Sequence, residues 1–251
     1  MTEETLQSLT LALEAASDAE TAAAARKQIR PLRGIRGVPQ RAIAQAVDAV
    51  WKAAPPRLPA SGALLSRLFS AAYEDGIAAI ALLAAVVPDH PDDADALARD
   101  WLSRTDDLLT ADALGWSVIG PAALVSGAGA AALCERPEEA SALTRRAMTA
   151  AALAFLPIPF EGPSAAALRA RLGTPDVMYV PVAQSPAVAA VARHFVRDLD
   201  PGVQKGMRRL LRSWGQHDPE ALRAWARAVP GGMPRLLTDE VDRVLGPGWR
   251  R

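Results

Sequence analysis

A cationic stripe near the C-terminus is the first feature with the chemistry of a binding surface. Lys205, Arg208, Arg209 and Arg212 follow one another at positions i, i+3, i+4 and i+7. In an α-helix this spacing places the four side chains on one face. A row of cations suits the phosphate groups of a nucleic-acid backbone. We therefore predict phosphate contacts here, with an ordinary solvated helix face as the alternative.

Two adjacent arginines form a second candidate site. Arg145 and Arg146 lie within a segment that is rich in Ala, Met and Leu. Placing guanidinium groups in such a segment is costly unless they reach solvent or an anion. We predict that these arginines also contact phosphates.

The charges of the chain are segregated, although 28 basic and 28 acidic residues cancel overall. Residues 26–41, which include Arg33 and Arg36, hold six basic residues and no acidic one, and residues 193–235 hold nine basic residues against four acidic ones. An Asp-rich stretch, residues 89–112, lies between them. This distribution favours one face that meets phosphates and another that stays in solvent.

The composition indicates that helices position these residues. Half of the 251 residues are apolar but only 5% are aromatic, so Ala, Leu and Val must do most of the packing. Alanine is the strongest helix former, and residues that favour strands are scarce. We therefore expect an all-α protein.

Several classes of site are excluded by residue type. The single cysteine, Cys134, excludes an internal disulfide and a cysteine-cluster metal site, and the three histidines lie far apart, so we expect no metal and no cofactor. The acidic, amphipathic N-terminus does not resemble a signal peptide. Gly and Pro interrupt the apolar stretches before the roughly 20 residues that a membrane span needs. We expect a cytoplasmic, nucleoid-associated protein that does not bind membranes.

Helical segments, punctuated by Pro, Gly and Asp, run along the whole chain. Before an acidic linker at residues 88–93 they are 4–16, 19–29, 40–54, 61–73 and 74–87; after it they are 94–104, 109–133, 137–156, 187–199, 201–216, 218–229 and 238–245. Such a succession is typical of degenerate HEAT-type repeats, and a globular bundle is the alternative. We predict one domain, residues 1–251, with a Pro- and Gly-rich insertion loop at residues 157–186 that contains one short helix.

Four segments, in the same order, resemble the DNA alkylation repair family of HEAT-like glycosylases. They are LRGIRGVPQRAIAQAV, LFSAAYEDGIAAIALL, LLTADALGWSVIGPAAL with the later TRRAMTAAALAFL, and VQKGMRRLLRSWGQHDPEALRAW. The resemblance implies a C-shaped α-solenoid whose concave, basic face holds double-stranded DNA. It also implies a glycosylase that excises N3- or N7-alkylated, cationic purines without flipping the base into a pocket. We expect the protein to act as a monomer.

The resemblance assigns the catalytic carboxylate to Asp112, because the family has a Gly eight residues further on and Gly120 stands there. The family's backbone-contacting Arg corresponds to Arg146, with Arg145 beside it. In a competing register Trp116 takes the position of the family's tryptophan and Gly120 that of the Asp. The alternative, purely structural interpretation of Asp112 is that it caps the N-terminus of a helix after Thr110 and Ala111.

This chain departs from the family at two aromatic positions. Leu108 and Arg209 stand where the family has tryptophans that hold the cationic base, and an Arg would repel such a base. Trp116, one helical turn after Asp112, could supply an aromatic wall instead. Two other function classes therefore remain: a non-catalytic HEAT-repeat protein that binds duplex or branched DNA by shape and backbone charge, and a protein–protein scaffold.

Overall fold

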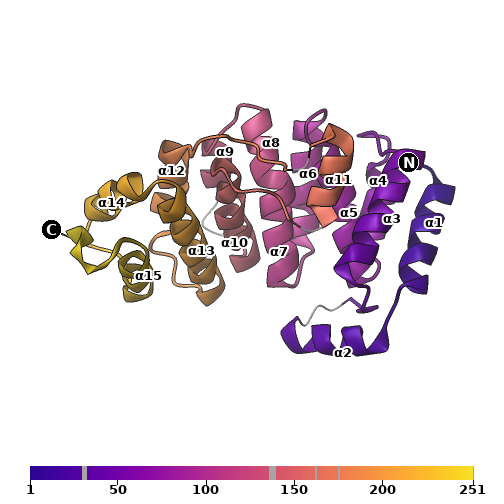
Figure 1. The fold of residues 1–251 in the computed structure, drawn as a ribbon, viewed down its shortest axis with the longest axis horizontal. Coiled ribbons are helices and arrows are strands. Elements are labelled where there is room, and N and C mark those ends of the chain that lie inside the picture. Colours follow the sequence, from indigo (N-terminus) through magenta and orange to yellow (C-terminus); the bar gives the residue numbers. More distant parts are fainter. Residues whose placement is uncertain (30–32, 136–139, 162, 175, 251) are drawn as a thin grey trace.

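The protein is all-helical throughout the part that the structure describes. The computed structural model describes residues 1–29, 33–135, 140–161, 163–174 and 176–250, and these contain helices, turns and loops but no strand. The expectation of an all-α protein is confirmed. Figure 1 shows the helices stacked side by side along the long axis of the molecule, with the two termini at opposite ends.

The helices form two layers in which successive members contact one another. The inner layer contains α3 (Gln40–Ala53), α5 (Tyr73–Val86), α7 (Leu108–Leu114), α10 (Ala142–Ala151), α13 (Pro201–His217) and α15 (Arg235–Leu245). The outer layer contains α1 (Glu3–Ala15), α4 (Gly62–Phe69), α6 (Pro91–Ser103), α8 (Gly120–Val125), α9 (Ala131–Cys134), α12 (Ser185–Phe195) and α14 (Pro219–Ala228). Outside the two layers lie α2 (Ala19–Gln28) and α11 (Pro163–Leu172).

Aspartate caps and prolines set many of the helix starts. The side chains of Asp18, Asp107, Asp200 and Asp218 each accept a backbone N–H in the first turn of the helix that follows. Proline stands in the first turn of α6, α12, α13 and α14, where its missing N–H costs nothing. The predicted break between the first two helices at Asp18 is therefore confirmed.

Two expected boundaries differ from the structure. The second half of the predicted acidic linker is helical, because Pro91, Asp92 and Asp93 form the first turn of α6. Acidic side chains at this position stabilise the helix, because they lie at the positive end of its dipole. The segment at residues 109–133 is not one helix: α7 passes through a π-helical turn, Gly115–Ile119, into α8, and α9 follows separately. The predicted helix start at Pro137 lies outside the described residues.

Glycines let this π-helical turn and α8 press directly onto α10. A Cβ atom at Gly115 would overlap the backbone carbonyl oxygen of Ala147, and one at Gly120 would overlap that of Ala151. Only glycine permits such close approach of two backbones. Leu108–Val125 is apolar enough by composition to resemble a membrane span, but 67% of it is buried inside the protein, as in a core helix.

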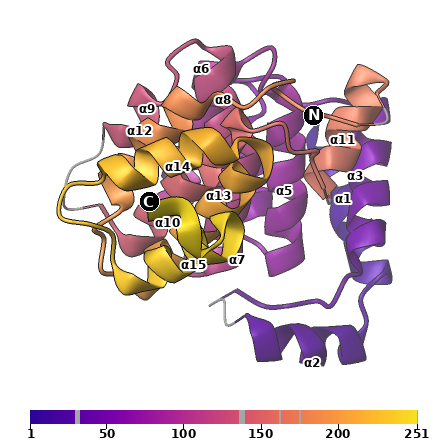
Figure 2. The ribbon, with the colours of Figure 1, turned by 60° about the vertical axis from the view of Figure 1, so that its left-hand side comes forward.

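The insertion is packed against the body of the protein. Its one helix, α11, lies over α3 and α5 through the buried side chains of Ala165, Ala167 and Leu168 (Figures 1 and 2). With α4 packed against α5 as well, nearly every residue from Glu74 to Val86 is buried. The predicted short helix within residues 157–186 is present as α11, whereas the interpretation of this segment as an insertion stays a prediction.

Candidate functional site

Asp112 lies inside α7 and does not begin it. The N-cap of α7 is Asp107, whose carboxylate accepts the N–H of Thr110 at 2.8 Å. The N-cap interpretation of Asp112 is therefore wrong. The side chain of Asp112 is 12% exposed, so it is not fully enclosed in the core.

Arg146 holds this carboxylate with two parallel hydrogen bonds. Its Nε donates to Oδ1 of Asp112 at 2.8 Å and its Nη2 donates to Oδ2 at 2.5 Å, while Nη1 donates to the carbonyl of Gly202 at 2.6 Å. This paired geometry is the strongest arrangement of Arg with a carboxylate. One guanidinium thus joins α7, α10 and α13 and fixes the orientation of Asp112. Phosphate contact by the 5%-exposed Arg146 side chain stays a prediction.

A polar cavity of about 480 Å³, here called the central cavity, opens beside this ion pair. It is lined by the end of α2, the start of α7 and two cations, through Gln28, Ile29, Asp106, Asp107, Leu108, Leu109, Arg146 and Lys205. Leu108, at the position where the resemblance expects a tryptophan, is 40% exposed. The cavity therefore has an aliphatic rim, and its polar wall combines two cations with two carboxylates.

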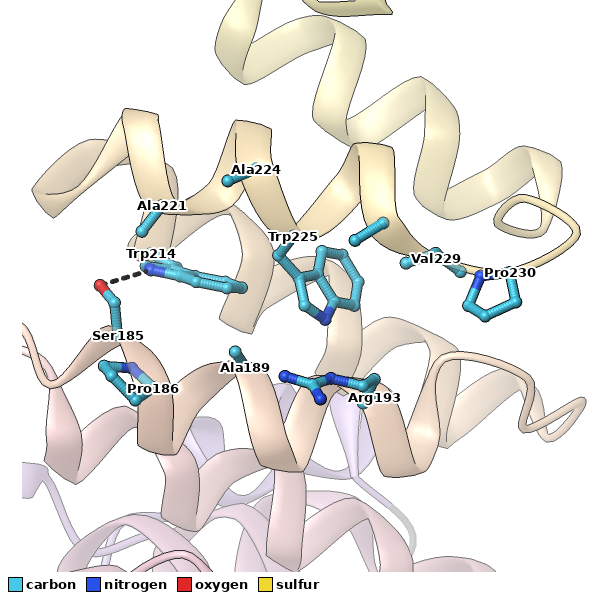
Figure 3. A pocket seen from close by; sticks show the side chains of 11 residues that line it. Ser185, Pro186, Ala189, Arg193, Trp214, Ala221, Ala224, Trp225, Val229 and Pro230 are labelled. Atoms are coloured by element: carbon cyan, nitrogen blue, oxygen red, sulfur yellow. Dashed lines mark hydrogen bonds between the residues drawn. The ribbon is translucent and has the colours of Figure 1, made fainter.

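A larger cavity, of about 540 Å³, lies between α12 and α14 of the outer layer. Figure 3 shows Trp225, Ala189 and Arg193 around it, with Trp214 donating its indole N–H to the hydroxyl of Ser185 at 3.0 Å. None of the predicted site residues lines this cavity. Arg146, which holds Asp112, and Lys205 both line the smaller, central cavity, so we place the candidate site there.

Trp116 lies in the π-helical turn and contacts the insertion. Its ring packs on Phe160 with centroids 5.0 Å apart, and Phe160 in turn meets Tyr179 edge-on at 5.0 Å. The guanidinium carbon of Arg209 lies 6.0 Å from the centroid of Trp116, within the range of a cation–π contact. The aromatic wall proposed for a cationic base therefore already holds a cation from the protein itself.

The cationic stripe on α13 divides into two halves. Within the described residues, no acidic side chain forms an ion pair with Lys205 or Arg209, and both are exposed. Arg208 and Arg212, by contrast, both donate to Glu240 of α15. The prediction that the four side chains bind phosphates remains a prediction for each of them.

Arg145 points away from Asp112. Its Nε donates to Asp198 and its Nη1 to the carbonyl of Ala140, each at 2.5 Å. The hydrogen bond from Arg145 to Asp198 raises the pKa of Arg145 above its ordinary value, so this arginine stays charged within the pair. A phosphate could contact Arg145 only by sharing its guanidinium group with the carboxylate of Asp198.

Arg33 and Arg36 anchor the basic N-terminal segment to the helices beneath it. Arg33 donates to the carbonyl of Phe69 at 2.5 Å, and its guanidinium lies 4.8 Å from the Phe69 ring centroid. Arg36 donates to Asp75 at 2.9 Å and to Glu14 at 3.1 Å. Their side chains are only 15% and 23% exposed. Phosphate binding by this pair stays a prediction, and it would compete with these internal contacts.

Sequence reasoning missed the acidic partners of the arginines. Asp198, Glu240 and Asp75 lie 53, 32 and 39 residues from the arginines that they bind. A pairing across helices leaves no spacing signal along the chain. Among the ion pairs with these three carboxylates, the contact of Arg243 with Glu240, three residues apart on α15, does follow helical periodicity.

A family model described as DNA alkylation repair enzyme matches residues 9–240. No curated protein matches the chain significantly. Among the described residues no group of three or more His, Cys, Asp or Glu side chains is placed to hold a metal ion.

Proposed function

Because this chain belongs to the DNA alkylation repair enzyme family, we propose that it is a DNA glycosylase that excises N3- or N7-alkylated purines from duplex DNA. The observation that carries the proposal is the fork of hydrogen bonds between Arg146 and Asp112 beside the central cavity. It presents one oriented and partly accessible carboxylate at the junction of three inner helices. The two-layer stacking of the helices supports a HEAT-like solenoid whose inner face receives the DNA.

An alkylated purine needs little chemical help to leave. It already carries a positive charge, so the bond from C1′ to N9 breaks with its electron pair moving to the base, which departs as a neutral molecule. The sugar is left as an oxocarbenium ion, water adds to C1′ and one proton is released. Asp112 would stabilise the positive sugar and position this water. Each of its oxygens has a second lone pair beyond the one used by Arg146.

The contact of Asp112 with Arg146 supports the register in which Asp112 is the carboxylate. In the competing register this chain has Gly120 at the position of the family's Asp and would carry no catalytic carboxylate. Asp112, by contrast, is oriented by Arg146, and its side chain is 12% exposed.

The direct test is release of 7-methylguanine and 3-methyladenine from methylated duplex DNA by the purified protein. Release above the spontaneous rate is expected, together with abasic sites in equal amount. Absence of release, with duplex DNA still bound, would favour the second candidate described below. Absence of both release and salt-dependent DNA binding would favour a protein–protein scaffold.

The second candidate is a non-catalytic protein that binds DNA by backbone and shape, and the contact between Arg209 and Trp116 favours it. A cationic base brought to Trp116 would meet the positive charge of Arg209. Leu108, which lines the central cavity, offers no π-system there. Both features weaken the hold on a cationic base without affecting phosphate contacts.

Replacing Arg209 with tryptophan should separate these candidates. Arg209→Trp removes the repulsion and adds a ring whose cation–π contact is worth about 0.5–2 kcal/mol, so kcat/KM on 7-methylguanine duplexes should rise about threefold or more. Arg209→Gln is the matched control, because it removes the charge without adding a ring and should give a smaller gain. Equal rates for the two variants would show that no ring is needed at this position.

A further inference from the structure

Three arginines surround one buried carboxylate on the inner layer. Arg208 Nε and Arg212 Nε donate to Glu240 at 2.9 Å and 2.8 Å, and Arg243 Nη1 donates at 2.8 Å. Glu240 is fully buried, whereas the arginine side chains are 30%, 50% and 57% exposed. We call these four residues the Glu240 cluster. Its centre is inaccessible and its cationic rim faces outward.

The Glu240 cluster carries an excess of positive charge. Burial alone would raise the pKa of Glu240, but hydrogen bonds from Arg212 and Arg208, together with the charges of Arg212 and Arg243, lower it below its ordinary value. Glu240 is therefore ionised at neutral pH. Three guanidinium groups against one carboxylate leave two positive charges at the surface.

The arginines of the Glu240 cluster retain unused hydrogen-bond donors. Arg208 and Arg212 give only their Nε–H to Glu240, and within the described residues no other hydrogen bond engages them. Each therefore keeps both terminal amino groups, with four N–H donors in a fixed plane. Anchoring through Nε restricts the guanidinium before any ligand arrives, so less side-chain freedom is lost on binding.

The Glu240 cluster lies on the same face as the central cavity. At about 100° per residue, Lys205, Arg208, Arg209 and Arg212 span roughly 100° of the surface of α13. This arc lies opposite the buried side chains of Val203, Met207 and Trp214. Arg209, on the side toward α10, reaches Trp116, and Arg208, on the side toward α15, reaches Glu240. The cluster therefore continues the cationic surface from the cavity onto α15.

We propose that the Glu240 cluster is a preorganised site for a backbone phosphate of the bound duplex. Arg208, Arg212 and Arg243 are the phosphate donors, and Glu240 is a positioning residue that touches no DNA. The proposal rests on the proposed function only in that duplex DNA is the ligand, because it requires binding but no excision. It adds Arg243 to the candidate interface and locates that interface beyond the central cavity.

The test is the salt dependence of duplex affinity. The triple variant Arg208→Gln, Arg212→Gln and Arg243→Gln should lower the magnitude of the slope of log affinity against log [KCl] by about 0.9 for each phosphate that is no longer neutralised, and thus by at least about 0.9. Arg223→Gln, on α14 of the outer layer, is the matched control, because that side chain is also 30% exposed in an ion pair. Its slope should equal that of the wild type.

Glu240→Gln tests the positioning role, because the two explanations predict opposite signs. If Glu240 merely adds a negative charge near DNA, its removal should tighten binding. If it orients the arginines, duplex affinity should fall about three- to tenfold, the factor expected when a long side chain must be ordered on binding. Thermal unfolding of each variant monitors the fold.

Two results would overturn the proposal while leaving the DNA function intact. The first is a slope of log affinity against log [KCl] that is unchanged in the triple variant but smaller in Lys205→Gln. The second is tighter duplex binding by Glu240→Gln, which would rule out the positioning role of Glu240. Failure of the wild-type protein to bind duplex DNA at any salt concentration would instead overturn the DNA function itself, and the phosphate site with it.

Discussion

Asp112→Asn is expected to lower the rate of alkylpurine release by about 10²–10³, the usual effect of removing one preorganised group that stabilises charge in a transition state. The amide keeps the shape of the side chain and can still accept one hydrogen bond from Arg146. It loses the negative charge that would face the oxocarbenium ion. Single-turnover release of 7-methylguanine measures the effect, because product release does not limit that rate.

Three measurements together separate an effect on chemistry from one on folding or binding. Asp100→Asn on α6 is the matched control, since Asp100 is paired with Arg104 on the outer layer and should retain the wild-type rate. Duplex affinity of Asp112→Asn should change far less than its release rate. A variant that folds, binds DNA and releases base at the wild-type rate would remove Asp112 from the mechanism and with it the preferred register.

Gly115→Ala and Gly120→Ala should each destabilise the protein strongly. The added methyl group would overlap a backbone carbonyl of α10 in both cases, and a carbonyl within a helix cannot move aside without shifting that helix. Overpacking of this kind costs about 2–3 kcal/mol. For a chain of this size the midpoint of thermal unfolding should fall by roughly 5–10 °C.

Gly62→Ala provides the comparison for these two substitutions. Gly62 is the first residue of α4, and a Cβ atom there would meet nothing within 4 Å. Alanine is favoured over glycine in a helix, so stability should stay the same or increase slightly. If all three variants had equal midpoints, the close approach of α10 to α7 and α8 would be contradicted.

Local signals explain why much of the fold could be predicted. Asp18, Asp200 and Asp218 cap the helices that follow them, and capping depends on residues within one turn. The π-helical turn at Gly115–Ile119 was missed because no local signal marks it, and the close approach of its Gly115 to α10 is a contact between distant segments. The position of α11 over α3 and α5 could not be predicted for the same reason.

The candidate site was predictable in part. The resemblance brought Asp112 and Arg146 together as candidates, and the structure places them in direct contact. Counting basic residues overstated the free positive charge, because Arg33, Arg36 and Arg145 are engaged by carbonyls and carboxylates from other helices. Which charges remain available to a ligand depends on tertiary contacts that composition does not contain.

For the proposed duplex ligand, the covering of α5 by α11 sets the length of DNA that the inner layer could contact. Because α5 is buried nearly all round, the inner layer offers a ligand a continuous row only from α7 through α10 and α13 to α15. Three steps between neighbouring helices at about 8–10 Å span roughly 24–30 Å. At about 3.4 Å per base pair this is about seven to nine base pairs. Duplexes shorter than this footprint should lose affinity with each base pair removed. Longer duplexes should gain affinity only because they offer more equivalent positions for binding.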